Sequence, residues 1–370
     1  MRAAGGAAHP PHLPRPTPAV LRNLLFDRFP TLRDRLPWIP LATVPTPVEA
    51  LPSPDGFRGR LFVKRDDLTS PLYGGNKVRK FEYLLADARR RGARALVTVG
   101  GIGSNQGLAA ALHGAALGFV VELSLGWQPV TEAVRRAVRG MVAAGARIRY
   151  AGGAVGMLLN AAAAMRDRRR AGETPYYIPI GATNALSSMG YVAAALELAA
   201  QVRAGEVPEP DRLFVPAGTC GTAAGLLVGC RVAGLRTRVM AVRVVDRALA
   251  NTPLIQWRAR RVATLLARLD PAVPRVRIAR REVNVVSGFV GEGYGAPTRA
   301  AEQALAWAAP RLRLETTYTG KALAACLEWC RNRATGETVL FWNTHNSASF
   351  ATAPDLGGLS ASLRALLAGP

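Results

Sequence analysis

Residues 72–82 read LYGGNKVRKFE and place two lysines, Lys77 and Lys80, beside a Gly-Gly-Asn turn. The chain holds 48 Lys plus Arg residues, of which only four are lysines, so arginine supplies almost all of the positive charge. Unlike a guanidinium, a lysine amine can lose its proton when it is buried and can then act as a nucleophile or base. The pattern points to a chemical role for one of the two lysines, with two solvated charges as the alternative.

A helix is predicted from Lys77 to about Arg91, with Asn76 as its N-cap. At about 100° per residue, one stripe of this helix is apolar and contains Val78, Phe81, Leu84, Leu85 and Ala88. Lys77 falls inside that stripe and Lys80 at its margin. Burial and the positive end of the helix dipole both lower the pKa of an amine, which favours attack on a carbonyl carbon as in a Schiff base. The alternative is a lysine that extends past the first turn to solvent.

Composition favours a globular protein that binds a small molecule. The chain has 370 residues, 49% of them hydrophobic, which is enough for two domains or one large α/β unit. The net charge of +23 suggests nucleic acid, but the arginines form short groups, such as 88–94 and 166–170, that are not interleaved with aromatic residues. We therefore expect no nucleic-acid partner, while anionic substrates or a phosphate-bearing cofactor remain compatible with the charge.

Cysteine and hydropathy patterns favour a soluble cytoplasmic protein without metal or membrane partners. Cys326 and Cys330 lie one helical turn apart, and the other two cysteines have no nearby histidine, so neither a zinc spacing nor a disulfide framework is present. The N-terminal segment lacks the apolar core of a secretory signal. The longest apolar stretch, 107–125, is interrupted by His113 and Glu122.

Apolar strands followed by glycine turns and Ala/Leu-rich helices recur along the chain, which predicts βαβ units with mainly parallel sheets. The predicted strands are 61–64, 95–100, 120–125, 147–151, 212–218, 239–245 and 338–343. We predict an α/β fold of two lobes, each with a mainly parallel twisted sheet flanked by helices. The predicted division is an N-terminal arm at 1–45 with one short helix at 20–29, a smaller domain at 94–205, and a larger, cofactor-binding domain at 46–93 and 206–370.

Two glycine-rich turns precede predicted helices. The stretch PAGTCGTAAGLLVGC at 216–230 would present backbone amides and threonine hydroxyls to an anion, such as the phosphate of pyridoxal phosphate held at Lys77, although an ordinary strand-to-helix connection looks similar. The stretch VGGIGSNQG at 99–107 suits either of two sites. One is a dinucleotide site of Rossmann type with Glu122 as the ribose acid; the other is a contact for a cofactor ring oxygen and a substrate carboxylate.

Further polar groups lie next to apolar segments. Tyr318 occurs in TTYTGKAL at 316–323 and Tyr294 in GEGYG at 291–295; the alternative for either is a core ring with a satisfied hydroxyl. Thr344 and His345 follow the last predicted strand, at the carboxyl end that faces the ligand crevice of a parallel sheet.

Together these segments resemble the fold type II (tryptophan synthase β-like) pyridoxal-phosphate-dependent enzymes, in the branch with D-cysteine desulfhydrase and 1-aminocyclopropane-1-carboxylate (ACC) deaminase. The resemblance covers roughly residues 40–350 and is carried by KRDDLTSPLYGGNKVRKFEYLL (64–85) and TVGGIGSNQ (98–106). It implies catalytic roles for Lys77, Ser104, Tyr294 and Tyr318. It implies cofactor contacts from Asn76, Lys77, Asn105, Gly218, Thr219, Cys220, Gly221, Thr222 and Thr344. It implies substrate contacts from Ser104, Asn105, Gln106, Tyr294 and Tyr318.

The resemblance implies a homodimer that cleaves a small amino acid, most like D-cysteine, to an α-keto acid, ammonia and sulfide. Where the deaminases are expected to have Glu facing the pyridine nitrogen, this chain has Thr319, which resembles the desulfhydrases and favours elimination. ACC deamination, another amino-acid lyase reaction and an NAD(P)-dependent oxidoreductase remain alternatives. Two departures bear on the substrate: Cys220 replaces a glycine of the phosphate loop, and NTHN at 343–346 brings His345 and Asn346 near the expected substrate position.

Overall fold

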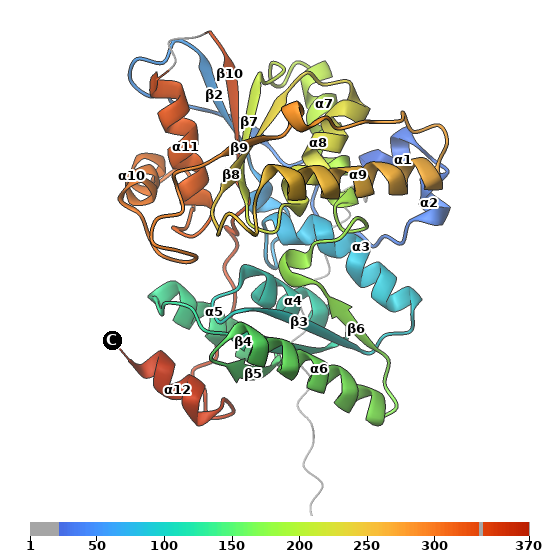
Figure 1. Ribbon diagram of the computed structural model, residues 1–370, viewed down its shortest axis with the longest axis vertical. Helices are drawn as coiled ribbons and strands as arrows, with labels where there is room; N and C mark the ends of the chain where they lie inside the picture. The colour runs from blue at the N-terminus through green and yellow to red at the C-terminus, as the bar shows by residue number, and fades with distance from the viewer. Residues whose placement is uncertain (1–21, 333–335, 370) are drawn as a thin grey trace, which may run out of the picture.

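The computed structural model describes residues 22–332 and 336–369, which form two lobes, each built on its own sheet (Figure 1). Of the predicted N-terminal arm, residues 1–21 lie outside the described residues. The arm's predicted helix is observed as α1 (Leu24–Arg28), and α2 (Leu32–Arg35) follows it. Leu25 and Leu32 are fully buried in the larger lobe's core, so residues 22–36 are packed onto that lobe.

The larger lobe contains a six-stranded sheet in the order β1-β2-β10-β7-β8-β9. Only the β1/β2 pair is antiparallel; every other pair is parallel. Its strands are β1 (Val48–Leu51), β2 (Arg60–Lys64), β7 (Arg212–Ala217), β8 (Arg238–Arg243), β9 (Asn284–Val286) and β10 (Thr338–Trp342). The short 3-10 turns η1 (Asp66–Leu68) and η3 (Arg280–Glu282) connect these elements. The mainly parallel sheet predicted from the sequence is confirmed.

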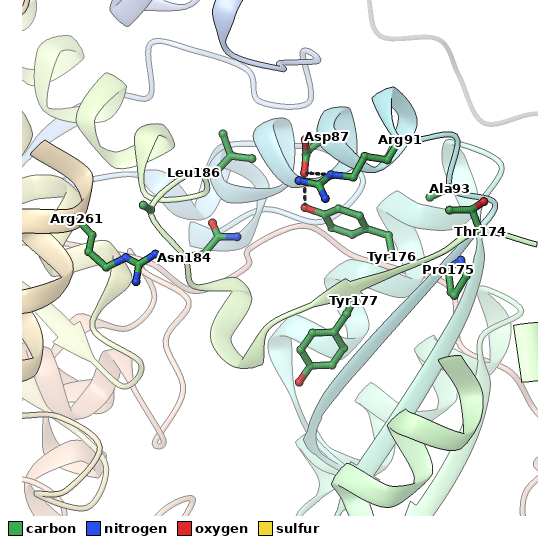
Figure 2. A pocket seen from close by; sticks show the side chains of 11 residues that line it. Asp87, Arg91, Ala93, Thr174, Pro175, Tyr176, Tyr177, Asn184, Leu186 and Arg261 are labelled. Atoms are coloured by element: carbon green, nitrogen blue, oxygen red, sulfur yellow. Dashed lines mark hydrogen bonds and ion pairs between the residues drawn. The ribbon is translucent and has the colours of Figure 1, made fainter. Parts of the chain in front are cut away.

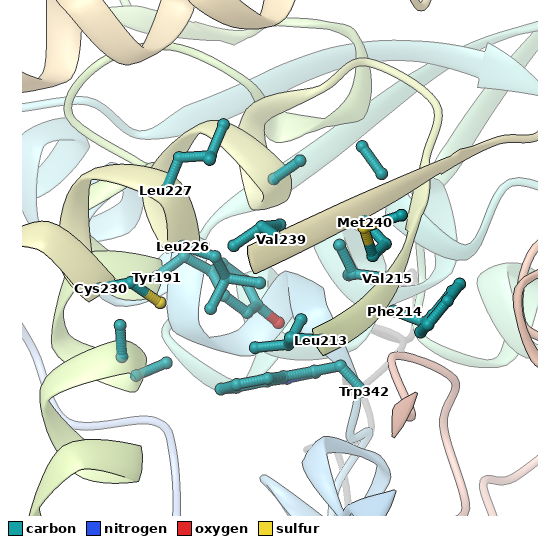
Figure 3. Packing of buried hydrophobic residues seen from close by; sticks show 14 of the residues in the cluster. Tyr191, Leu213, Phe214, Val215, Leu226, Leu227, Cys230, Val239, Met240 and Trp342 are labelled. Atoms are coloured by element: carbon teal, nitrogen blue, oxygen red, sulfur yellow. The ribbon is translucent and has the colours of Figure 1, made fainter. Parts of the chain in front are cut away.

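Helices cover both faces of this sheet because its strands bury side chains on alternating sides. Figure 3 shows the face where Tyr191 and Leu226 approach Leu213 and Trp342. On the opposite face, the rings of Phe214 and Trp329 lie 6.1 Å apart. The helices of this lobe are α7 (Met189–Arg203), α8 (Gly221–Ala233), α9 (Thr252–Leu269), α10 (Arg299–Ala308) and α11 (Thr319–Asn332).

The smaller lobe contains a four-stranded, all-parallel sheet in the order β5-β4-β3-β6. Its strands are β3 (Ala95–Gly101), β4 (Val120–Gly126), β5 (Arg147–Ala151) and β6 (Pro175–Ile178), and η2 (Ile180–Ala182) follows β6. Its helices are α4 (Asn105–Ala116) and α5 (Glu132–Ala143) on one face and α6 (Ala154–Arg170) on the other. Of the ten strands in residues 22–332 and 336–369, seven overlap the seven predicted ones. The other three, β1, β6 and β9, have at most four residues each and were not predicted.

Two helices pack on a lobe that their position in the chain does not suggest. Met189 to Ala199 of α7 belong to the core of the larger lobe, although 94–205 was predicted as the smaller domain. Leu363 and Leu367 of α12 (Ala361–Ala368) are buried in the core of the smaller lobe. The predicted domain limits remain a prediction. No helix within the described residues is both long enough and apolar enough to span a membrane.

The helix that carries the two lysines, α3 (Asn76–Arg90), begins one residue earlier than predicted. Its N-cap is Gly75 and not Asn76, and no side chain caps it. Gly75 has φ +87°, and a Cβ there would lie 2.6 Å from the carbonyl oxygen of Thr344. Only glycine fits this position, because the backbone after β10 approaches the start of α3 directly. Asn76 is thereby the first helical residue, and its side-chain amide donates to Oγ1 of Thr222 at 3.3 Å, at the cavity described below.

Candidate active site

A cavity of about 600 Å³ lies where the carboxyl ends of strands from both sheets meet. Its wall contains every residue for which the family resemblance implies a cofactor, substrate or catalytic contact. These residues are Asn76, Lys77, Ser104, Asn105, Gln106, Gly218, Thr219, Cys220, Gly221, Thr222, Tyr294, Tyr318 and Thr344. The tertiary structure therefore gathers in one site segments from six separate parts of the chain, while their individual roles remain predictions.

Lys77 extends from the first turn of α3 into this cavity. Burial lowers the pKa of its amine to about 8. Within the described part of the chain, no hydrogen bond or ion pair engages that amine, so it is available to an incoming aldehyde. A depressed pKa and an unengaged nitrogen are the two properties that a Schiff-base lysine requires.

Lys80, which helix phase placed at the margin of the apolar stripe, is 1% exposed and lines the same cavity. Its Nζ donates to the carbonyl oxygen of Gly181 and to Oγ1 of Thr183, both at 3.1 Å. Burial, with the positive charges of Lys77 and Arg258 nearby, lowers the pKa of Lys80 well below its ordinary value. Sequence analysis missed Lys80 because residues of the η2 segment, far away in the chain, cover that face of α3.

Arg258 of α9 is a further cation in this wall that the sequence did not indicate. Its Nε is buried and has no hydrogen-bond partner among the described residues. The wall thus contains three basic side chains, Lys77, Lys80 and Arg258, next to the start of α8. Such a concentration of positive charge favours an anionic ligand.

The turn before α8 forms a polar cradle. Cys220 has φ +65°, in the left-handed region, and this directs the chain into the first turn of α8 at Gly221. The hydroxyl oxygens of Thr219 and Thr183 lie 2.7 Å apart. A Cβ on Gly221 would lie 2.7 Å from Oγ1 of Thr183 and 3.2 Å from Nζ of Lys80, so a side chain there would fill the cradle. Unpaired N–H groups at a helix start, flanked by hydroxyls and an amine, suit a phosphate group.

The Ser104–Gln106 segment begins α4, and its three side chains are engaged differently. Ser104 is the N-cap and accepts from the backbone N–H of Gly107 at 3.1 Å. Asn105 accepts from the phenol of Tyr73 at 3.2 Å, which leaves its amide N–H groups for a ligand. Gln106 donates to Oγ1 of Thr98 and to the carbonyl oxygen of Pro179, so its amide nitrogen already ties α4 to β3 and β6.

Tyr294 and Tyr318 lie side by side in the wall of the cavity, with their phenol oxygens 2.7 Å apart. Desolvation of the hydroxyl raises the pKa of both phenols, although the Tyr294 residue is 38% exposed, so both stay protonated at neutral pH. Glu315 also lines the cavity, and the sequence did not indicate it. Its carboxylate accepts from the backbone N–H groups of Tyr318 and Thr319 and from the Thr319 hydroxyl, so it caps the start of α11.

The loop after β10 departs from the sequence prediction at one residue. Thr344 and His345 line the cavity, and Nδ1 of His345 is buried without a partner among the described residues. Burial lowers the pKa of His345. Asn346, expected near the substrate, instead accepts from the N–H of Gly74 at 2.6 Å and does not line the cavity. Its side chain fastens this loop to the turn before α3.

The Rossmann alternative required Glu122 as a ribose acid, and the structure contradicts that role. Glu122 is 3% exposed within β4 and pairs with Arg168, with Arg147 and Arg149 close by. Oε1 accepts from Arg168, Nε of Arg149 lies 3.7 Å from Oε2, and Glu122 does not line the cavity, so it is not placed to bind a ribose there. The glycines of 99–107 consequently belong to the turn that presents Ser104 and Asn105.

A second cavity, of about 570 Å³, lies apart from Lys77, between the end of α3, β6 and α9 (Figure 2). In its wall, Asp87 accepts from Arg91 at 2.8 Å and from the phenol of Tyr176 at 3.0 Å. Its carboxylate is therefore already paired, and none of the sequence-predicted site residues lies there.

Residues 39–344 match the family described as pyridoxal-phosphate dependent enzyme. The chain is 36% identical over 315 residues to nocardicin C-9' epimerase of Nocardia uniformis subsp. tsuyamanensis. The matched residues cover 84% of this chain and 92% of that protein. It is 31% identical over 312 residues to D-cysteine desulfhydrase of Salmonella paratyphi B, and the matched residues cover 80% of this chain and 88% of that protein.

Solved structures are similar over most of the chain. A crystal structure of an ACC deaminase homologue has a TM-score of 0.75 and 28% identity, and covers 87% of this chain and 95% of that one. A crystal structure of O-ureido-L-serine synthase has a TM-score of 0.56 at 17% identity, over 81% of this chain and 89% of that one, and shows similarity of fold alone.

Proposed function

The chain belongs to the pyridoxal-phosphate-dependent enzymes, in the fold type II branch with D-cysteine desulfhydrase and ACC deaminase, and on this premise we propose that it is an amino-acid β-lyase. The reaction removes the Cα proton of an amino acid and releases a β-substituent such as a thiol, as D-cysteine desulfhydrase would with D-cysteine. The single observation that carries the proposal is the unengaged Lys77 amine, with its lowered pKa, in one cavity with a phosphate-sized cradle.

The residues present fit the cofactor. In this proposal Lys77 holds its aldehyde, Asn105 and Thr344 contact its ring, and the turn 218–222 with Lys80 holds its phosphate. When bound, pyridoxal phosphate supplies an electron sink for the charge that develops at Cα. Cys220 contributes backbone and not its thiol, because Sγ is directed at the carbonyl oxygens of Gly218 and Leu249.

The chain's own groups would handle protons and orientation. The Lys77 amine, when free, accepts the Cα proton at a pKa close to the working pH. The start of α4 at Ser104 and Asn105 orients the substrate carboxylate. The Tyr294–Tyr318 pair, held protonated by burial, donates to the leaving group.

The test combines a spectrum with a covalent trap. Purified protein is expected to be yellow, and borohydride is expected to fix the cofactor on the peptide that contains Lys77. Lys77→Ala should be colourless, with Lys321→Ala as the matched control, since Lys321 already donates to the carbonyl oxygen of Val290 at 2.6 Å. A lysine adduct retained after Lys77→Ala would overturn the assignment. Panels of D- and L-amino acids and ACC, assayed for keto acid and sulfide, then identify the reaction.

Epimerisation is a second candidate, favoured by the 36% identity to nocardicin C-9' epimerase. Inversion at Cα needs a base on one face of the carbon and an acid on the other, and Lys77 and Ser104 come from two separate segments of the same cavity wall. In D₂O, epimerisation gives deuterium at Cα with inverted product and no keto acid, whereas elimination releases keto acid. Measuring both products for each amino acid separates the two functions.

We further propose that the enzyme acts in the cytoplasm as a homodimer, as the resemblance to the family implies. Light scattering coupled to size-exclusion chromatography measures the mass, for which a 39.3 kDa chain predicts about twice that value.

A further inference from the structure

The mouth of the active-site cavity carries large apolar side chains that are left open to solvent. Trp127 is 58% exposed, Ile180 51% and Leu249 60%, and all three line the cavity. Most of the other exposed large hydrophobic residues of the described chain lie outside it, including Val155, Leu158 and Leu159 of α6. Exposed apolar groups that converge on one opening mark a ligand-binding surface more often than scattered ones do.

The three residues follow three different parallel strands. Trp127 comes directly after β4 and Ile180 shortly after β6, both in the smaller lobe, whereas Leu249 follows β8 in the larger lobe. Leu249 adjoins the cofactor cradle, since its carbonyl oxygen lies 3.7 Å from Sγ of Cys220. The apolar mouth therefore borders the site from both lobes, and a group held there would be covered from two sides.

The inner wall is different in character, with Lys77, Ser104, Asn105 and the threonine-rich cradle supplying polar contacts. In the proposed function, these polar groups bind the amine and carboxylate of the amino acid, and a side chain as short as that of cysteine has little apolar surface for further contacts. The cavity of about 600 Å³ falls within the roughly 300–1,000 Å³ of sites that bury drug-sized ligands.

We infer that the amino-acid substrate carries a bulky aromatic or apolar group beyond its β-carbon, and that Trp127, Ile180 and Leu249 form the subsite for that group. This inference rests on the proposed function, whose chemistry at Cα it leaves unchanged. Covering apolar surface supplies the binding energy, and the polar inner wall fixes the reacting end.

The test uses the holoenzyme and a pair of substrates that differ only at this group, cysteine and S-benzylcysteine, each as both enantiomers. The dissociation constant is measured from the change in the cofactor's absorption band, and KM and kcat from product release. Burial of a benzyl group predicts binding about 10- to 100-fold tighter for S-benzylcysteine than for cysteine. The ratio of the two dissociation constants should fall several-fold towards one in Trp127→Ser and in Leu249→Ser.

Leu158→Ser is the matched control, because Leu158 is 56% exposed but does not line the cavity, and it should leave the ratio unchanged. Equal affinity for the two amino acids, or a ratio that neither Trp127→Ser nor Leu249→Ser alters, would overturn the inference. An absorption band that no amino acid perturbs would instead contradict the proposed function, so the two failures are distinguishable.

Discussion

The phenol oxygens of Tyr294 and Tyr318 lie 2.7 Å apart, so one hydroxyl donates to the other at the wall of the active-site cavity. Tyr294 comes from a glycine-rich loop and Tyr318 from the residue before α11. Neither phenol has another side-chain hydrogen bond among the described residues. Each ring therefore depends on the other for its orientation, and the pair can present only one proton at a time to a ligand.

Replacing either tyrosine with phenylalanine should consequently damage the same step. We expect kcat to fall by about 10²- to 10⁴-fold in Tyr294→Phe and in Tyr318→Phe. The double variant should be little worse than either single one, because the two hydroxyls act as a unit. Steady-state kinetics provide the measurement, and an unchanged absorption spectrum shows that the cofactor is still bound. Additive losses would argue that the tyrosines act independently.

The pKa of Lys77 predicts how the apoprotein reacts with aldehydes. Because burial lowers this pKa from its usual 10.5 to about 8, the neutral amine forms as the pH rises through about 8, well below the range of an ordinary lysine. The rate of Schiff-base formation with pyridoxal should increase between about pH 6 and 9 and level off above about pH 9, as the neutral fraction of an amine with a pKa of about 8 does. Stopped-flow absorbance measures it. A rate that continues to climb to pH 10 would show an unperturbed amine.

Lys80 should contribute to affinity for the phosphate group and not for the ring. Burial lowers the pKa of Lys80, but a bound phosphate anion favours its protonated form. A charge-assisted hydrogen bond of about 1.5–3 kcal/mol then predicts that Lys80→Met weakens binding of pyridoxal phosphate to the apoprotein by about 10- to 100-fold. Binding of pyridoxal, which lacks the phosphate, should change little. Arg89→Met, on the exposed side of the same helix, serves as the control in a fluorescence titration. Equal losses for both ligands would point to a structural defect.

Arg79, one turn beyond Asn76, anchors α3 to the larger lobe. It is 3% exposed and donates to Asp66 at 2.8 Å and to Glu197 at 2.9 Å. Removing it leaves buried carboxylates unpaired, so Arg79→Met should lower the free energy of unfolding by about 3–5 kcal/mol. Arg79→Lys should also lower the free energy of unfolding, but by less than Arg79→Met, because the point charge of a lysine cannot serve both carboxylates at once. Urea denaturation measures both variants.

The same network predicts sensitivity to acid. Burial alone would raise the pKa of Glu197, but Arg79 and Lys64 lower it to about 2. A depressed carboxyl pKa contributes stability that is present above the ordinary 4.5 and is lost as the pH falls towards about 2. Melting temperatures of the wild type should therefore fall over that range, and Glu197→Gln should show a smaller fall from a lower starting value.

The left-handed backbone conformation of Cys220 leads to a prediction for two substitutions at this position. A non-glycine residue in the left-handed region costs about 1–2 kcal/mol, so Cys220→Gly should keep both stability and affinity for pyridoxal phosphate. Cys220→Val should lose both, because a β-branched side chain tolerates φ +65° poorly. Thermal unfolding and cofactor titration distinguish the variants, and full activity of the valine variant would show that the turn relaxes.

The sequence by itself determined the features that depend on local periodicity. Apolar segments followed by glycine turns and Ala/Leu-rich segments predicted seven strands that are observed. Helix phase placed Lys77 on the apolar stripe of α3, because the direction of a side chain follows from its position within one element. The ends of those strands also identified the loops that line the cavity, since parallel strands direct their carboxyl ends to one edge. The strands β6 and β9 were not predicted, because a strand of three or four residues is too short to show a periodic pattern of apolar residues.

Only the tertiary structure decided what covers each surface. Lys80 is buried because Gly181 and Thr183 of the smaller lobe close over a helix face that is polar by sequence. Glu122 forms an ion pair with Arg168, and the side chain of Asn346 accepts a hydrogen bond from the backbone N–H of Gly74 and does not line the cavity. Burial and pairing are set by elements distant in the chain, so a residue's own neighbours cannot reveal them. The pKa of Lys80 and the apolar mouth around Trp127 both follow from that assembly of two lobes.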